Sequence, residues 1–150
     1  MISCSIYDKH YEHCLCDLWS SVNIMPKVIF EELQYPALSP TSILVQLVDS
    51  STRYPEGIVE NMVVRVNGSF ILANFMVMDM EGDLGIQLIL GRPFLRTARA
   101  RIDVRRGEIH FCADGDRGSR SFVGFWITLV VGGARHTDPA SDPKTRIQQS

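Results

Sequence analysis

The sequence has no long apolar run and no excess of one charge, and each absence excludes a class of partner. Its longest apolar stretch, FVGFWITLVVGG at 122–133, is shorter than the about 20 residues that a membrane-spanning helix needs. The 15 Lys and Arg residues stand against 17 Asp and Glu residues, for a net charge of −2. A nucleic-acid-binding surface needs a clustered excess of basic residues. We therefore expect neither a membrane nor a nucleic acid as a partner.

One local group of basic residues lies between 92 and 106, but apolar residues interrupt it. We expect these side chains to line the solvated face of a helix and a turn: Arg96, Arg99, Arg101, Arg105 and Arg106.

Cysteine is scarce, and its spacing is not that of a disulfide framework. The sequence contains four cysteines, and no signal peptide precedes them, which favours a reducing, cytoplasmic compartment. The one cluster of metal-ligand residue types is His10, His13, Cys14 and Cys16. It lacks the paired spacing of structural zinc sites, so we expect these residues on two faces of a strand, with no metal and no other cofactor.

Length and apolar content are those of one domain with a buried core, at 150 residues and 45% hydrophobic. We place this domain at residues 1–122, followed by an apolar extension at 123–133. Residues 134–150 are polar and rich in Pro, Ser, Asp and Gln, so we expect a disordered tail.

Most of the domain consists of short strand-like runs. ISCSI (2–6) and YEHCLCDL (11–18) flank a turn, and SILVQLVD (42–49) is a further strand. In GIVENMVVRV (57–66), alternation places Ile58, Met62, Val64 and Val66 on one face with Glu60. Asn67-Gly68 then closes a hairpin into SFILANFMVMDM, because both residues tolerate positive φ.

Helical signals are limited to two segments, PKVIFEEL (26–33) and RPFLRTARA (92–100). After them, RIDV and EIHF form another hairpin around an RRG turn. Many short strands with two brief helices predict an all-β fold, a small closed β barrel.

The order of these elements resembles the retropepsin-like aspartic proteases: an Asp that ends a strand, a loop, a short helix, a polar hairpin, and an apolar-apolar-Gly run that opens a second helix. More narrowly, four stretches look like the protease domain of plant Gypsy-type retrotransposon polyproteins: CDLWSSVNIMPKVIF, LVQLVDSSTRYPEGIVENMVVRV, FMVMDMEGD and LILGRPFLRTARARIDVRRGEI. The resemblance covers about residues 2–122, and LILGRPFL is its most specific piece.

The resemblance implies that Asp17 is catalytic, in a dyad that activates water for peptide hydrolysis. One carboxylate takes a proton from water while the other group protonates the carbonyl oxygen. Two carboxylates so close retain one proton between them, so their titration belongs to the pair. Because the chain carries one such Asp, the active site requires a homodimer with Asp17 from each copy, and the substrate is a polypeptide, the polyprotein itself.

The remaining site residues follow from the same resemblance. DSSTRYPEG contains the flap that closes over bound peptide, with Gly57 allowing it to bend: Ser51, Thr52, Arg53, Tyr54, Pro55, Glu56 and Gly57. Support for the catalytic loop is implied for Ser20, Ser21, Ile89, Leu90, Gly91 and Arg92. Two other acids are not expected to belong to the dyad. We expect Asp83, in Asp-Leu-Gly, to lie in a turn, and Asp103 to be a hairpin or surface residue.

Trp19 is the main departure from the family, which has Asp-Leu-Gly-Ala-Ser where this chain has Asp17-Leu18-Trp19-Ser20-Ser21. Gly suits a tight turn that leaves no room for a side chain. A Trp there predicts backbone strain of about 1–3 kcal/mol and an indole beside the dyad.

We therefore interpret the chain as an aspartic endopeptidase domain that is a degenerate copy. The alternative is a catalytically inactive module that dimerises or binds extended peptides. A β-barrel interaction domain unrelated to proteases fits the composition but not the aligned run from Asp17 to Ile109.

Overall fold

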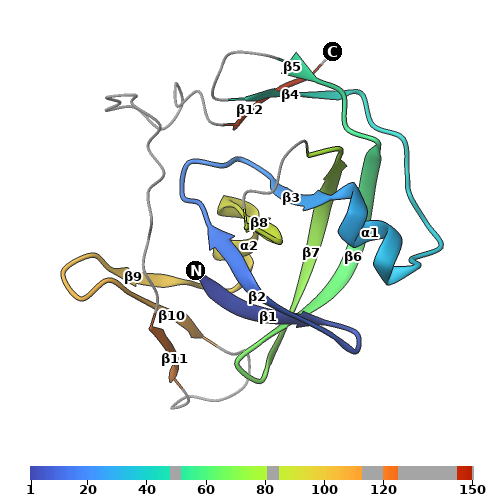
Figure 1. Ribbon diagram of the computed structural model, residues 1–150. Helices are drawn as coiled ribbons and strands as arrows, with labels where there is room; N and C mark the ends of the chain where they lie inside the picture. Colours follow the sequence, from blue (N-terminus) through green and yellow to red (C-terminus); the bar gives the residue numbers. More distant parts are fainter. Residues whose placement is uncertain (48–51, 81–84, 113–119, 125–144, 150) are drawn as a thin grey trace.

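A closed six-stranded barrel forms the centre of the molecule. The computed structural model describes residues 1–47, 52–80, 85–112, 120–124 and 145–149 (Figure 1). The barrel strands run in the order β1 (Ile2–Ile6), β2 (Lys9–Cys16), β8 (Leu88–Leu90), β3 (Asn23–Pro26), β7 (Ser69–Met78) and β6 (Gly57–Val66). The helices of the described part are α1 (Lys27–Leu33) and α2 (Arg92–Thr97). The predicted all-β barrel with two short helices is confirmed.

Local turn signals account for the long hairpin of the barrel. Asn67 has φ 48° and Gly68 has φ 84°, so both central residues of the β6–β7 turn adopt the positive φ that the sequence predicted. Val66 pairs directly with Ser69 across this turn.

The middle of β6 differs from the expected alternation. Its pairing with β7 shifts between Val59 and Met62, and Asn61 has φ 55°. This β-bulge places one extra residue in β6, so Val59 enters the core in place of Ile58, which is only half-buried. The prediction that Ile58 shares a face with Met62 is therefore wrong, because regular alternation does not continue through a bulge.

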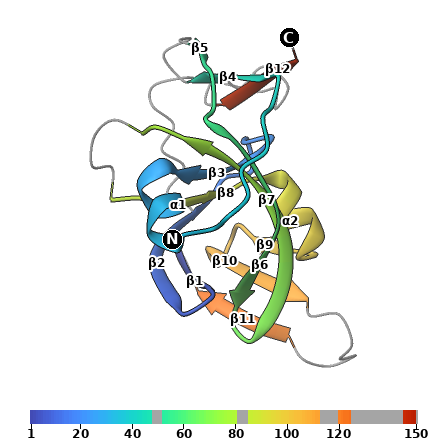
Figure 2. The same ribbon diagram turned by 90° about the vertical axis from the view of Figure 1, so that its right-hand side faces the viewer.

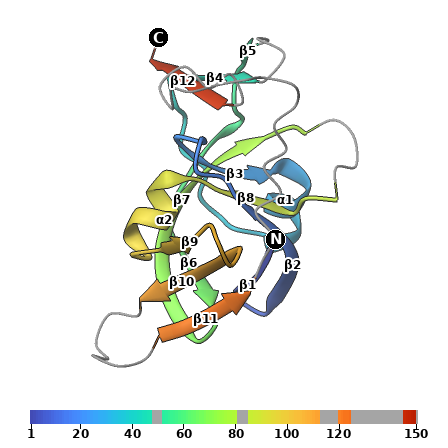
Figure 3. The same ribbon diagram turned by 90° about the vertical axis from the view of Figure 1, so that its left-hand side faces the viewer.

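Both helices pack on the barrel and present an apolar side to it. Ile29 of α1 and Phe94 and Leu95 of α2 are buried. Phe94 also meets Phe111 edge to face, with ring centroids 6.2 Å apart. Phe111 belongs to β10 (Glu108–Cys112), the central strand of a sheet with β9 (Arg101–Asp103) and β11 (Arg120–Gly124), which lies beside α2 in Figure 3. No helix in the described ranges is long and apolar enough to cross a membrane.

A third sheet forms at one end of the barrel and includes the last described residues of the chain (Figure 2). It contains β12 (Thr145–Gln149), β4 (Ile43–Leu47) and β5 (Thr52–Arg53), in that order. Residues 145–149 thus differ from the expected disordered tail, because an edge strand can pair with any extended segment whatever its composition. The apolar extension begins within β11, and its residues 125–133 lie outside the described part. The division of the chain at 122 stays a prediction.

Candidate active site

Asp17 begins the loop that connects β2, on one side of β8, to β3, on its other side. Strand β8 pairs in parallel with β2, through Cys16 and Leu90, and antiparallel with β3, through Ile24 and Ile89. Residues 17–22 connect β2 to β3 around the end of β8. Asp17 is therefore the first residue after a strand and lies next to residues 89–91, as the sequence predicted.

Backbone hydrogen bonds hold Asp17 in this loop. Its N–H donates to the carbonyl oxygen of Leu90 over 2.9 Å. Its Oδ1 accepts a hydrogen bond from the N–H of Trp19 at 2.9 Å, and its carbonyl accepts one from Ser20 at 3.3 Å. The side chain is half-buried. One carboxylate oxygen is thus oriented by the loop while part of the residue stays accessible.

The backbone at Trp19 is not strained in the way the sequence suggested. Among the described residues other than glycine, φ is positive at Tyr7, Gln34, Asn61, Asn67 and Arg99, and Trp19 is not one of them. Its N–H also makes the bond to the Asp17 carboxylate that the loop requires. The prediction of strain is wrong, because this turn closes with an ordinary φ at position 19. The half-buried side chain of Trp19 nevertheless adds volume close to Asp17.

Ser20 supports the loop from inside. It is fully buried, and its Oγ donates to the carbonyl oxygen of Val22 at 2.6 Å. Its own carbonyl accepts the N–H of Arg92 at 2.9 Å, which ties the loop to the start of α2. Ser21 is half-buried in the same bend. Ser20 and Arg92, two of the residues expected to support the loop, thus contact each other through their backbones; their support of a catalytic site stays a prediction.

Gly91 is required because two backbone carbonyls approach it closely. A Cβ added there would lie 2.2 Å from the oxygen of Val22 and 2.7 Å from that of Ser20. Only glycine leaves this space free without a shift of the loop. The LILG segment therefore supports the Asp17 loop by close packing, and the three β8 residues Leu88, Ile89 and Leu90 are buried or half-buried.

Asn23 is a site residue that the sequence analysis missed. It is buried, its Oδ1 accepts the N–H of Gly91 at 2.8 Å, and its Nδ2 donates to the carbonyl of Asn74 at 3.0 Å. It thereby links β3, β7 and the end of β8. A polar residue at the head of the apolar run NIMP was the available signal, because a buried amide needs partners.

The predicted flap is a short hairpin whose described residues differ in part from the expectation. Thr52 and Arg53 form β5 and pair with Gln46 and Val45 of β4. Ser51 lies outside the described residues, as does the whole β4–β5 connection at 48–51. Figures 1, 2 and 3 place this hairpin at the barrel end that carries residues 17–22.

Residues 54–57 form the return from the hairpin to the barrel. Tyr54 is exposed and Pro55 half-buried, whereas the N–H of Glu56 donates to Val77 of β7 at 2.8 Å. Gly57 is buried at the start of β6, where a Cβ would lie 2.6 Å from the carbonyl oxygen of Ser39. Gly57 thus lets the 38–39 segment approach β6 closely, and its role as the bend of a flap stays a prediction.

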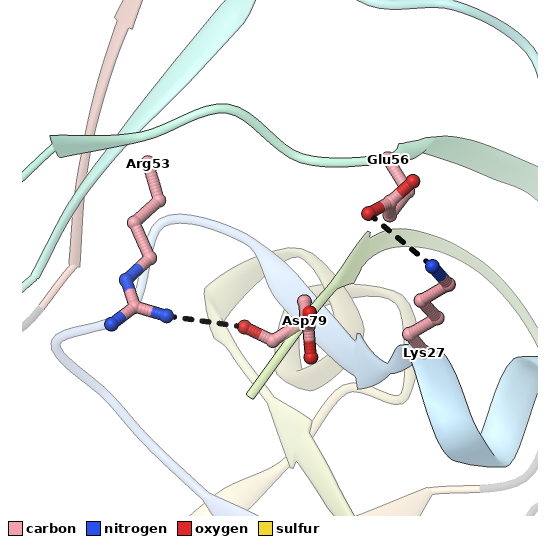
Figure 4. A network of polar contacts seen from close by, with 4 residues as sticks. All are labelled: Lys27, Arg53, Glu56 and Asp79. Carbon is pink, nitrogen blue, oxygen red and sulfur yellow. Dashed lines mark hydrogen bonds and ion pairs between the residues drawn. The ribbon is translucent and has the colours of Figure 1, made fainter. Parts of the chain in front are cut away.

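Polar contacts anchor this return to the barrel (Figure 4). The guanidinium of Arg53 donates to the carbonyl oxygen of Asp79 at 3.3 Å. Lys27 Nζ lies 3.7 Å from Glu56 Oε1, and both side chains are exposed. These contacts hold the β5 side of the hairpin near the end of β7 and the start of α1.

The cysteines near Asp17 do not form a second reactive centre. Cys4, Cys14 and Cys16 are free and buried, with 3.0 Å between the sulfurs of Cys4 and Cys14. The side-chain hydrogen bond between Cys14 and Cys4, together with burial, raises the pKa of Cys14, and burial raises the pKa of Cys16 to about 12. Within the described residues, no group of three or more His, Cys, Asp or Glu side chains is arranged to hold a metal ion.

The other acids behave as surface or turn residues where the structure describes them. Asp103 Oδ1 accepts the N–H of Arg106 at 3.0 Å in the β9–β10 turn. Asp83 lies outside the described residues, and Gly85 after it has φ 63°. The basic residues of 96–106 are exposed, as expected: Arg96, Arg99, Arg101, Arg105 and Arg106.

Comparison with known proteins supports the fold. No protein-family model matches the chain, and no curated protein matches its sequence. Among solved structures, the crystal structure of the retroviral protease-like domain of Ddi1 from Leishmania major is similar, with a TM-score of 0.57 and 20% sequence identity. The match covers 81% of this chain and 93% of that one. With its closed barrel, its two short helices and Asp17 at the end of β2, this chain has the retropepsin-like fold.

Proposed function

We propose that the chain is a retropepsin-type aspartic endopeptidase domain, derived from a plant Gypsy-type retrotransposon polyprotein and degenerate in activity. The observation that carries this proposal is the position of Asp17. It follows β2 directly, its N–H is bonded to Leu90, and its carboxylate is oriented by the N–H of Trp19. A single acid held in this way is half of an aspartic dyad.

The chemistry requires a second carboxylate, and a second copy of the chain supplies it. With Asp17 of two copies across a two-fold axis, one carboxylate removes a proton from water and the protonated partner donates to the scissile carbonyl. The two groups then share one proton, because two charges so close cannot both ionise. This mechanism needs no cofactor, and its substrate is an extended polypeptide.

The β4–β5 hairpin is the proposed flap. It lies at the barrel end that carries the β2–β3 connection, residues 17–22 (Figure 1). Val45 of its strand β4 is buried in a cluster with Ile24 of β3 and with Met76 and Met78 of β7. Val22 and Ile89, which neighbour the Asp17 loop, pack against the same cluster. A peptide held between hairpin and loop would meet this apolar surface.

The indole of Trp19 is the reason to expect little activity. The side chain lies two residues from Asp17, where the partner copy and the substrate would approach. Since the Trp19 backbone forms the required hydrogen bond, the expected defect is steric. A catalytically inactive dimerisation or peptide-binding module is the second candidate, and the same indole favours it.

The test compares the unmodified chain, Asp17→Asn, Trp19→Gly, and the double variant Trp19→Gly/Asp17→Asn. Sedimentation measures dimerisation, and cleavage of an unfolded protein at mildly acidic pH measures activity, with and without pepstatin. We expect little or no cleavage by the unmodified chain, pepstatin-sensitive cleavage by Trp19→Gly, and none by the double variant.

The possible outcomes separate the two candidates. If the unmodified chain cleaves robustly and Asp17→Asn abolishes the cleavage, the chain is not a degenerate copy, and the assignment as a protease stands. Dimers without cleavage in any form would favour the inactive module. Monomers in every form at concentrations of roughly 0.1 mM would contradict the dyad.

A further inference from the structure

The pairing of β4 shows which strand holds it in place. Strand β4 makes two residue pairs with β5, Val45 with Arg53 and Gln46 with Thr52. With β12 it makes five, from Ile43–Gln149 to Leu47–Thr145. A two-stranded hairpin is at best marginally stable in water, so β12 contributes most of the ladder that orders β4.

Side chains on one face of β4 pack against the barrel near the loop that contains Asp17. Val45 is fully buried, in the cluster that contains Ile24, Met76 and Met78. Ile43 also packs against this cluster. A strand that holds β4 from outside therefore also keeps these side chains against the apolar surface beside the Asp17 loop.

Without β12, the outer edge of β4 would expose a row of unpaired N–H and C=O groups. Such an edge accepts another extended chain, because the ladder bonds come from the backbone and place few demands on sequence. The antiparallel register of residues 145–149 shows the direction in which a strand fits there.

We propose that the outer edge of β4 is a strand-addition site, that the chain's own C-terminal strand β12 is its resident occupant, and that extended peptides compete with β12 for this edge. The pairing is independent of the proposed function. Its consequence for substrate access, that β12 restrains the proposed flap, rests on that function.

The test removes the backbone donors of β12 and leaves the rest of the chain intact. Successive N–H groups of a strand point in opposite directions, so Arg146→Pro together with Ile147→Pro removes at least one donor to β4. The matched control, Arg146→Ala together with Ile147→Ala, changes the same side chains but keeps both donors. Amide hydrogen exchange of residues 43–47 is the readout, and it needs no enzymatic activity.

We expect exchange in 43–47 to become at least about tenfold faster in the proline variant and to stay near the original rate in the alanine variant. Exchange in β6 and β7 should be the same in all three proteins, which shows that the barrel is intact. Unchanged exchange of 43–47 in the proline variant would overturn the proposal.

A second arm tests competition in trans. The probe is a fluorescein-labelled peptide of sequence KTRIQQS, residues 144–150, and its control carries Pro-Pro in place of Arg-Ile. Fluorescence anisotropy should show saturable binding of the probe to the proline variant, weaker binding to the unmodified chain, and no binding of the control peptide. Equal binding of both peptides, or no binding to the proline variant, would contradict a strand-addition site. Absence of peptidase activity would leave this result unaffected.

Discussion

The loop at residues 17–22 and the β4–β5 hairpin lie at the same end of the barrel (Figure 1), but different contacts hold them. The loop is held from within the barrel: Ser20, Asn23 and Gly91 are all buried, and each makes contacts to the backbone of another element. The hairpin is held by two pairs within itself, by β12 at its outer edge, and by exposed polar contacts at its base.

The loop and the hairpin should therefore respond differently to mutation. Mutations in the loop either remove buried contacts or introduce steric overlap, and both should lower the free energy of unfolding. Changes at the base of the hairpin affect solvent-exposed groups, whose interactions water and salt weaken. The proposed function would use this difference, because it asks the acid to stay in place while the cover over it moves.

Gly91→Ala should have the largest effect. The added Cβ would overlap the carbonyls of Val22 and Ser20, so we expect a loss of about 3 kcal/mol of unfolding free energy. Urea unfolding followed by circular dichroism measures it. The matched control is Gly68→Ala, where a Cβ meets nothing within 4 Å and only the positive φ costs about 1 kcal/mol. Equal losses in the two variants would break the comparison.

Asn23→Ala should come next, with a loss of about 2 kcal/mol, because it leaves the N–H of Gly91 and the carbonyl of Asn74 without their side-chain partner. Urea unfolding again measures the change, together with faster amide exchange at Gly91. Asn74→Ala is the control, since its side chain is exposed and accepts the N–H of Asn61, so its loss should cost under about 1 kcal/mol. A larger effect at Asn74 than at Asn23 would show that burial does not set the order.

Trp19→Gly should destabilise the monomer fold by about 1 kcal/mol. Position 19 does not need positive φ, so glycine adds only conformational freedom to the unfolded chain. Thermal unfolding of Trp19→Gly and Trp19→Ala measures the difference, and we expect the alanine variant to be the more stable. An increase in stability on Trp19→Gly would restore the idea of a strained backbone.

Lys27→Met should have the smallest effect, under about 0.5 kcal/mol, because its ion pair with Glu56 is exposed on both sides. The difference should vanish in about 1 M NaCl, where surface charges are screened. Urea unfolding at both salt concentrations measures it. A loss that persists in high salt would mean that the base of the hairpin is held by more than surface contacts.

Much of the fold could be predicted because its signals are local. Asn67-Gly68 requires positive φ whatever surrounds it, and the apolar spacing of 26–33 and 92–97 favours helix in each segment by itself. The bulge at Asn61 could not be predicted, because it depends on how β6 pairs with β7 and on the Asn74 side chain that accepts the N–H of Asn61.

The candidate site was predicted only where a residue resembles a motif. Asp17 and Gly91 were singled out in this way, and the structure brings their segments together through the bond from the Asp17 N–H to Leu90; their functional roles stay predictions. Asn23 was missed, since its structural role depends on two hydrogen-bond partners, Gly91 and Asn74, that are far away in the sequence. The strain assigned to Trp19 was wrong, because a one-letter motif does not report the φ that a loop adopts when its N–H groups find partners.

Short strands, tight turns, two brief helices and an acid just after a strand follow from the preferences of neighbouring residues, so they can be inferred from sequence. The pairing of β8 with both β2 and β3, the contact of Asn23 with Gly91, and the place of residues 145–149 along β4 depend on the folded barrel. Each of these joins segments far apart in the chain through backbone groups, which nearly every residue carries in the same form. Sequence alone therefore does not single out the partner, and the packing of the whole barrel does.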